Sequence, residues 1–238
     1  MRLFDHYLLT RFNLSGFKQG AHLDPAWLEH RLDLFERYCL PSVAGQLDKN
    51  FTWLLCLDER TPRPIRRRLA GLGADCAQAK TLYLAPGSRM QPAVVAAIMD
   101  RGDPPSFLMT SRLDNDDAIH LRYVQRLHEL FDRQALQFVN FSNGYTYRLM
   151  DRSLRRYRHP SNPFVTLIER YSTQPRTVLC AQHSEIGNVG PVFQVQDSPR
   201  WLQVIHDQNV RNTARGTLVP ADHVLLLRRE FAIRERRV

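Results

Sequence analysis

The chain has 238 residues, of which 43% are hydrophobic and 24% are charged. A chain of this length and composition can bury a full hydrophobic core, so disorder and a fibrous fold are excluded and a single domain, residues 1–238, is the simplest expectation. The net charge of +9 comes mostly from arginine and favours an anionic partner such as nucleic acid, acidic lipid or a diphosphate substrate. Arginines on solvated helix faces would explain the same charge.

The cysteines and the N-terminal segment bear on where the protein works. The four cysteines lie far apart, and none forms a pair with metal-ligand spacing, which argues against a zinc site or a dense disulfide framework and fits a reducing cytosol. Polar residues follow Met1 before a signal-type apolar run forms, and no stretch approaches the roughly 20 apolar residues of a membrane span. We therefore expect a cytoplasmic protein, soluble or peripheral to the membrane. The cysteines are Cys39, Cys56, Cys76 and Cys180.

The first 135 residues alternate between short apolar runs and segments with helical periodicity. This alternation predicts an α/β fold, a Rossmann-like, mostly parallel sheet with helices on both faces. Asp24 before Pro25 is a good helix start. The pattern predicts strands over residues 7–13, 51–58, 81–84 and 107–110, and helices over residues 25–40, 64–72, 92–99 and 119–131.

From residue 136 onward the pattern changes to short strands, which predicts an α+β part built onto the same sheet. Ser161-Asn162-Pro163 is typical of a helix start and would place Glu169 two turns into that helix. The tail from His223, with arginines between Arg228 and Arg237, predicts a basic amphipathic helix that packs on its own domain or rests on an anionic membrane. Strands are expected over residues 136–141, 145–149, 177–181, 192–195 and 202–205.

Three carboxylates within four residues, Asp114, Asp116 and Asp117, follow the strand expected at 107–110. Oxygen ligands of this kind suit Mg²⁺ or Mn²⁺, and such a cation would neutralise a leaving diphosphate. Alternatively, Asp116 or Asp117 caps the next helix and Asp114-Asn115 forms an Asx turn. One cap needs one acid, and neighbouring carboxylates repel each other, so the excess favours a cation.

Two other predicted strands deliver polar residues to the same place. In open α/β sheets the ligand lies beyond the carboxyl ends of the strands. Thr10 and Arg11 end the first strand and Asp58 ends the strand at 51–58, so we expect them to share a crevice with the carboxylates. Arg11 and Arg112 would add bidentate contacts to phosphate groups there.

The segment Arg112-Leu113-Asp114-Asn115-Asp116-Asp117 carries an Asp-x-Asp motif after the fourth predicted strand, and in this it resembles the GT-A glycosyltransferases. The wider pattern resembles the rhamnosyltransferase family of bacteria. The resemblance implies a GT-A-like fold, with residues 1–135 as the nucleotide-sugar-binding half and residues 136–238 as the acceptor-side half. The other resembling pieces are residues 38–42 with Gln46, 51–58, 162–164 with Glu169, and 201–206 with Asn209, which together span most of the chain.

The resemblance implies a nucleotide-sugar donor bound across the first half and a divalent cation, Mn²⁺ or Mg²⁺, on the Asp-x-Asp motif. Asp116 would hold the metal, with His206 as an additional ligand, although His206 is equally interpreted as a satisfied histidine at a strand end. Asp114 would lie near the donor ribose or sugar. The strand tips Thr10, Arg11 and Asp58 would contact the nucleotide, Asp58 at the base.

A displacement that inverts the sugar carbon needs a carboxylate base within reach of the acceptor hydroxyl. Three acids of the second half are candidates, Glu169, Glu185 and Asp207, and a surface salt bridge is the alternative role for each. His183 also follows a predicted strand and is a candidate to bind sugar hydroxyls or the diphosphate.

The sequence therefore predicts a metal-dependent, inverting glycosyltransferase that moves a sugar from a nucleotide-diphosphate donor to a hydroxyl of a glycan or lipid-linked acceptor. Rhamnose is implied by the resemblance alone. A metal-dependent phosphoester or glycoside hydrolase could use the same acids. A nucleic-acid binder is the least favoured alternative, because the aspartate cluster would repel phosphates in the absence of a cation.

Overall fold

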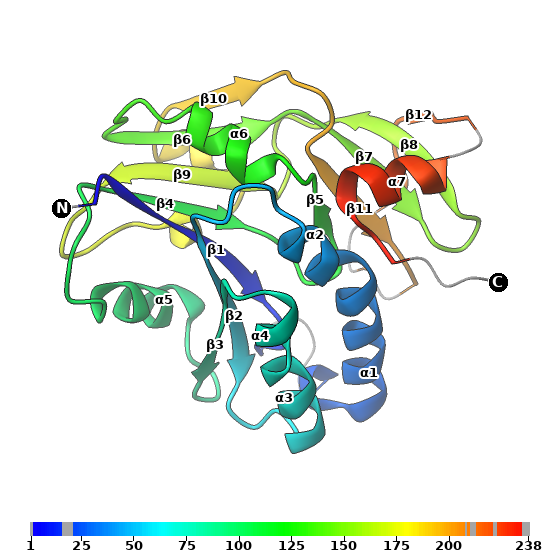
Figure 1. The fold of residues 1–238 in the computed structure, drawn as a ribbon, viewed down its shortest axis with the longest axis horizontal. Coiled ribbons are helices and arrows are strands. Elements are labelled where there is room, and N and C mark those ends of the chain that lie inside the picture. Colours follow the sequence, from blue (N-terminus) through cyan, green and yellow to red (C-terminus); the bar gives the residue numbers. More distant parts are fainter. Residues whose placement is uncertain (1, 16–20, 208, 210–212, 221–222, 235–238) are drawn as a thin grey trace.

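Figure 1 shows the computed structural model, which describes residues 2–15, 21–207, 209, 213–220 and 223–234. Strands alternate with helices along the first half of the chain, and two sheets carry the fold. In the described part of the chain, no helix is both long enough and apolar enough to cross a bilayer.

The larger sheet has seven strands and is mostly parallel. They are β1 (Phe4–Arg11), β2 (Thr52–Asp58), β3 (Ala79–Leu84), β4 (Phe107–Arg112), β6 (Leu136–Phe141), β9 (Val165–Arg170) and β10 (Val192–Val195), in the order β10-β6-β9-β4-β1-β2-β3. β1 pairs in parallel with β2 and β4, and β2 with β3. β9 is antiparallel to both of its neighbours, β4 and β6. The predicted mixed, mostly parallel sheet is confirmed.

Helices cover both faces of this sheet. Because side chains alternate along a strand, Leu8 of β1 packs with one set of helices and Leu9 with the other. On the Leu8 face are α1 (Pro25–Leu34), α3 (Arg63–Ala70) and α6 (Tyr123–Glu129), and on the Leu9 face is α5 (Met90–Met99). α1 continues through a π-helical turn, Phe35–Cys39, into α2 (Leu40–Ala44), and α4 (Leu72–Asp75) follows α3.

The smaller sheet lies at the right of Figure 1 and carries the C-terminal helix. The helix is α7 (His223–Phe231), and it buries Leu227 and Phe231 against the tyrosines of this sheet, so the predicted helix packs on its own domain. Arg236 and Arg237 lie outside the described residues. The strands are β5 (Ala118–Ile119), β7 (Asn143–Arg148), β8 (Ser153–Arg158), β11 (Trp201–Ile205) and β12 (Thr217–Leu218), in the order β12-β8-β7-β11-β5.

Two predictions in the second half are wrong. The helix expected from Pro163 through Glu169 is the strand β9, because its residues pair with β4 on one side and β6 on the other. Residues 177–181, expected as a strand, contain a short 3-10 helix, Val178–Cys180, after Thr177 adopts a left-handed φ of 56°. In both places tertiary pairing or local turn geometry overrides the apolar pattern.

The helix predicted over residues 119–131 begins only at Tyr123. Ala118 and Ile119 form β5 instead, because they pair with β11. Neither Asp116 nor Asp117 therefore caps a helix, and the capping alternative is wrong. The aspartate segment is the connection between β4 of the larger sheet and β5 of the smaller one.

Candidate active site

The carboxyl ends of β1, β2 and β4 lie at one edge of the larger sheet, as the parallel pairing requires. A cavity of about 230 Å³ opens at this edge beside the ends of β1 and β4. Its lining includes Arg11, Arg112 and Asp114, which the sequence predicts, and Arg89, which it does not. Three guanidinium groups and one carboxylate face this space, so the cavity suits an anionic ligand that carries hydroxyl groups.

The side chains around the cavity differ in how they are held. The Arg112 guanidinium lies 3.7 Å from the Asp114 carboxylate. Burial lowers the pKa of Arg11, with Asp114 acting in the opposite sense, although the group stays cationic at neutral pH. Thr10 is fully buried, and its hydroxyl accepts a hydrogen bond from the Trp53 indole at 2.9 Å. Of the two polar residues predicted at the tip of β1, Arg11 lines the cavity and Thr10 does not.

Asp58, at the end of β2, is held as a carboxylate. Its side chain accepts hydrogen bonds from Arg60 at 2.8 and 3.0 Å and lies 3.2 Å from His22. The bonds from Arg60 outweigh the effect of burial and lower the pKa of Asp58 to about 2. The carboxylate is therefore ionised at any physiological pH. It is buried and is not among the residues that line the cavity described above.

Asp116 is the centre of a buried polar cluster. Its Oδ2 atom accepts a hydrogen bond from Arg31 at 2.6 Å and lies 2.9 Å from His206 Nε2 and 3.5 Å from Asn209 Nδ2. Burial by itself would raise the pKa of Asp116, but the hydrogen bond from His206 and the charge of Arg31 outweigh it, and the pKa is lowered. The predicted pairing of Asp116 with His206 in space is thus present.

Asp117 has a different role from its neighbour. Its carboxylate accepts a hydrogen bond from the backbone N–H of Val204 at 2.9 Å, which ties the aspartate segment to β11. Burial, followed by the charges of Asp116 and Asp114, raises the pKa of Asp117 well above its ordinary value. The third carboxylate of the motif is therefore structural.

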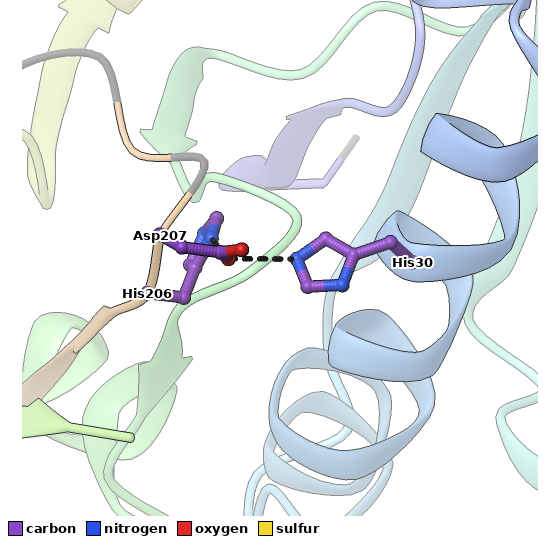
Figure 2. A group of neighbouring side chains, drawn as sticks. All are labelled: His30, His206 and Asp207. Atoms are coloured by element: carbon purple, nitrogen blue, oxygen red, sulfur yellow. Dashed lines mark ion pairs between the residues drawn. The ribbon is translucent and has the colours of Figure 1, made fainter. Parts of the chain in front are cut away.

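His206 also belongs to a second group of side chains, of the kinds that can bind a metal ion, and Figure 2 shows its three members. His30 projects from α1 toward His206 and Asp207, which follow β11. Asp207 Oδ1 lies 3.9 Å from both His30 Nε2 and His206 Nδ1, and one ligand atom from each residue lies within 4.8 Å of the others. The sequence reasoning missed His30, because only the fold brings α1 to the end of β11.

The donor chemistry of this group fits a divalent transition-metal ion. His30 Nε2 is buried and makes no hydrogen bond to any of the described residues. Burial, and then the neighbouring His206, lowers the pKa of His30, which favours the neutral imidazole that binds metals. Two imidazoles and one carboxylate suit Mn²⁺ or Zn²⁺ better than Mg²⁺, which prefers oxygen ligands alone.

The three predicted base candidates lie in unlike surroundings. Both carboxylate oxygens of Glu169 accept backbone hydrogen bonds, from Arg176 at 3.0 Å and Thr177 at 2.9 Å, so this buried acid orders the turn after β9. Glu185 is exposed just before the short 3-10 helix Ile186–Asn188. Asp207 is the candidate beside His206, and its side chain is 82% exposed.

His183, predicted to bind substrate, is partly exposed in the segment before that 3-10 helix. Its Nδ1 atom lies 2.6 Å from the carbonyl oxygen of Ser161, which fixes the ring to the turn before β9. Its role toward a substrate stays a prediction.

A family model described as "Putative rhamnosyl transferase" matches residues 6–218. The chain belongs to this family. The matched range contains the strand tips, the aspartate segment, His30 and His206. The polar side chains described above therefore lie within the part of the chain that the family model matches. The family resemblance drawn from the residues is thereby confirmed. No curated protein sequence matches the chain.

Solved structures share parts of the fold at low sequence identity. TarS of S. aureus, residues 1–349, has a TM-score of 0.47 and 11% identity, and the match covers 84% of this chain and 60% of TarS 1–349. The same protein in complex with UDP has a TM-score of 0.49 and 11% identity, with coverages of 86% and 61%. A putative nucleotide-diphospho-sugar transferase from Desulfovibrio desulfuricans G20 has a TM-score of 0.39 and 11% identity, with coverages of 84% and 82%.

Proposed function

We propose that the protein is a glycosyltransferase that moves a sugar from a nucleotide-diphosphate donor to a hydroxyl group of an acceptor. The observation that supports this most is the cavity at the carboxyl edge of the sheet, where three arginines and Asp114 converge within the family region. A donor of this class carries a diphosphate for the arginines and sugar hydroxyls for the carboxylate. The family description supports rhamnose as the transferred sugar.

The donor would lie across the strand tips. Arg11, Arg89 and Arg112 would bind the diphosphate oxygens, with the planar guanidinium groups able to form paired hydrogen bonds. Asp58, ionised and fixed by Arg60, would accept a hydrogen bond from an N–H of the nucleotide base. Asp114 would accept hydrogen bonds from hydroxyls of the ribose or the sugar.

A divalent cation at the polar cluster of Asp116 and His206 is part of this proposal. When bound, such an ion neutralises charge that develops on a leaving diphosphate. Arg31 already contributes a positive charge there through its 2.6 Å contact with Asp116. In this proposal the guanidinium charge of Arg31 would act on the leaving group together with the cation.

We propose direct displacement with inversion, in which an acid of the second half takes the proton of the acceptor hydroxyl. Of the three candidates, Glu169 accepts hydrogen bonds from two backbone N–H groups, whereas Glu185 and Asp207 have exposed carboxylates and remain for this step. Which of them acts can be tested by comparing the rates of Glu185→Gln and Asp207→Asn with saturating donor.

The acceptor would be a glycan or a lipid-linked saccharide. α7 buries one side and leaves Leu225 66% exposed beside the exposed Arg228 and Arg229. An apolar side chain flanked by cations is suited to peripheral contact with the anionic inner face of the cytoplasmic membrane, where a lipid-linked acceptor would be reached.

The donor site is tested by thermal unfolding of the purified protein with UDP, GDP, CDP and dTDP, each with and without Mn²⁺. A nucleotide at 100 times its dissociation constant should stabilise the fold by about 2.7 kcal/mol. We expect one nucleotide to act and the Arg112→Gln variant to lose the effect. Arg158→Gln, at an exposed position of β8, is the matched control and should keep it. Stabilisation by none of the four, or equal stabilisation of Arg112→Gln, would overturn the proposal.

A further inference from the structure

We propose that Leu179, held at the wall of the cavity by a strained turn, contacts the C6 methyl group of a 6-deoxy sugar and so selects such donors over those whose sugar carries a 6-hydroxyl. The turn consists of residues 176–180, and we call it the selectivity turn. The inference deepens the proposed function, on which it rests, because it names the class of sugar and a residue that recognises it. Rhamnose is a 6-deoxy sugar, in agreement with the family description.

The cavity has room for only part of a nucleotide sugar. Its volume of about 230 Å³ lies below the roughly 300–1,000 Å³ of pockets that enclose a whole small-molecule ligand. The three arginines of its lining suit phosphate oxygens, and Asp114 accepts hydrogen bonds from hydroxyls. The enclosed part of the donor is therefore the diphosphate with its sugar, and the base lies outside.

The rest of the lining offers the sugar an apolar surface. Leu9 belongs to the hydrophobic cluster on its face of the larger sheet, and Met90 and Leu179 pack against that cluster. All three line the cavity, with Leu9 buried and the other two partly exposed. A methyl group on this surface is removed from water favourably, whereas a hydroxyl that contacts only these side chains gives up water and gains no hydrogen bond.

The selectivity turn is held in a conformation that costs energy. Thr177, a β-branched residue, has φ 56° and ψ 165°, a region that almost only glycine occupies. Its neighbours enforce this conformation. The two carboxylate oxygens of the buried Glu169 accept from the backbone N–H groups of Arg176 and Thr177 at 3.0 and 2.9 Å. The next N–H, of Val178, donates to the Thr110 hydroxyl at 2.7 Å, so β9 and β4 together fix the turn.

The selectivity turn is also bonded to the other part of the apolar surface. The side chain of Gln91, at the start of α5, donates a hydrogen bond to the carbonyl of Arg176 at 2.8 Å. Gln91 directly follows Met90, so this bond holds together the two segments that carry Met90 and Leu179. Strain maintained by the surrounding structure is typical of ligand sites, and here it positions the residue that faces the cavity.

The test compares two donors that differ by one hydroxyl group. L-Rhamnose is 6-deoxy-L-mannose, so the probes are the L-rhamnose and L-mannose esters of the nucleoside diphosphate that stabilises the protein in thermal unfolding. Isothermal titration calorimetry measures their dissociation constants, with that nucleoside diphosphate alone as the reference. We expect the wild type to bind the rhamnose donor about 10- to 100-fold more tightly, the range in which an apolar pocket discriminates against an added hydroxyl.

Leu179→Asn, which puts a polar side chain of similar size at the wall, should bring the two affinities close to equality and leave binding of the nucleoside diphosphate unchanged. Leu179→Ala should lower the ratio by weakening the rhamnose donor alone, and it serves if the asparagine variant does not fold. Leu82→Asn is the matched control, because Leu82 is a partly buried leucine that packs on the same cluster outside the cavity lining. It should keep the wild-type ratio.

Equal binding of the two donors by the wild type would overturn the inference. A wild-type ratio in the folded Leu179 variants would overturn it too. Weaker binding of the nucleoside diphosphate alone in these variants would do the same, because the nucleotide and not the sugar would then lie against Leu179. Failure of every nucleoside diphosphate to bind the wild type would overturn the proposed function itself, so the two failures are distinguishable.

Discussion

A network of buried hydrogen bonds joins the centre of the larger sheet to Ser111, the residue before Arg112. His6 of β1 lies 3.0 Å from His128 and 2.8 Å from Ser111, and Ser111 lies 2.6 Å from Thr166 of β9. His128 lies 2.7 Å from Asp48 at the outer end. The network crosses β1, β4 and β9, so its protonation state affects the stability of the strands that carry the site.

The folded state disfavours protonation of both histidines in this hydrogen-bond network, His6 and His128. Burial, and then His128, lowers the pKa of His6 well below 6.5, and burial lowers that of His128 against the opposing effect of Asp48. The unfolded chain then binds more protons below about pH 6.5, so the free energy of unfolding falls as the pH drops from that value toward the folded pKa values. Above about pH 6.5 these groups leave stability unchanged with pH.

We predict that His6→Gln flattens this pH dependence. Urea unfolding at pH 7.5 and pH 5 measures the difference, which should be smaller in the variant than in the wild type even if the variant is less stable at both values. His183→Gln, which replaces a partly exposed histidine outside the network, is the control and should keep the wild-type difference. An equal difference in His6→Gln and the wild type would show that other groups set the acid sensitivity.

Single residues of the site were predictable to the extent that they follow strand ends. Arg11, Asp58 and Asp114 are placed at the sheet edge by the order of strands alone. Thr10 is turned into the core because neighbours on a strand face opposite ways, a signal present in the alternation of Leu9, Thr10 and Arg11. His30 carries no such signal.

At the scale of elements, the site depends on how β11 crosses the second half of the chain. Trp201 of β11 donates a hydrogen bond to the carbonyl of Phe141 at 2.8 Å and stacks on Phe164 with ring centroids 5.2 Å apart. The backbone of β7 passes directly beneath this indole at Gly144. This packing joins the two sheets close to the aspartate segment.

We predict that Gly144→Ala lowers the free energy of unfolding by at least about 1–3 kcal/mol, which is the usual cost of overpacking a core. A Cβ at this position would lie 2.0 Å from the Trp201 ring, which cannot move away without breaking its own contacts. The matched control is Gly187→Ala, where nothing lies within 4 Å of the added Cβ. Thermal or urea unfolding gives the comparison, and equal stability of the two variants would contradict the described packing.

The elements that the sequence predicted are those with repeated periodicity. The alternating strands and helices up to residue 112 are found within a few residues of the expected bounds, and Asp24 caps α1 by accepting from Trp27 N at 2.8 Å. β9 and β5 were expected as helical, because their identity is decided by partner strands far away in sequence. Apolar runs of this length fit either structure until the partners are known.

At the scale of the whole molecule, the site lies where the two sheets meet. β4 brings Asp114 to the edge of the larger sheet, and four residues later Ala118 belongs to the smaller one. β11 of the smaller sheet ends at Ile205, and the next residue, His206, lies 2.9 Å from Asp116. A donor bound on the larger sheet would thus have its transferred sugar directed toward elements of the second half, where an acceptor can approach.

Sugar transfer itself tests the central claim most directly. Purified protein would be given the nucleotide sugar that matches the stabilising nucleotide, with Mn²⁺ and with an acceptor glycan either free or lipid-linked in anionic vesicles. We predict that nucleoside diphosphate release rises with acceptor and equals the sugar transferred, as counted by mass spectrometry. Release at the same rate without acceptor, with free sugar as the product, would contradict the account and identify a hydrolase.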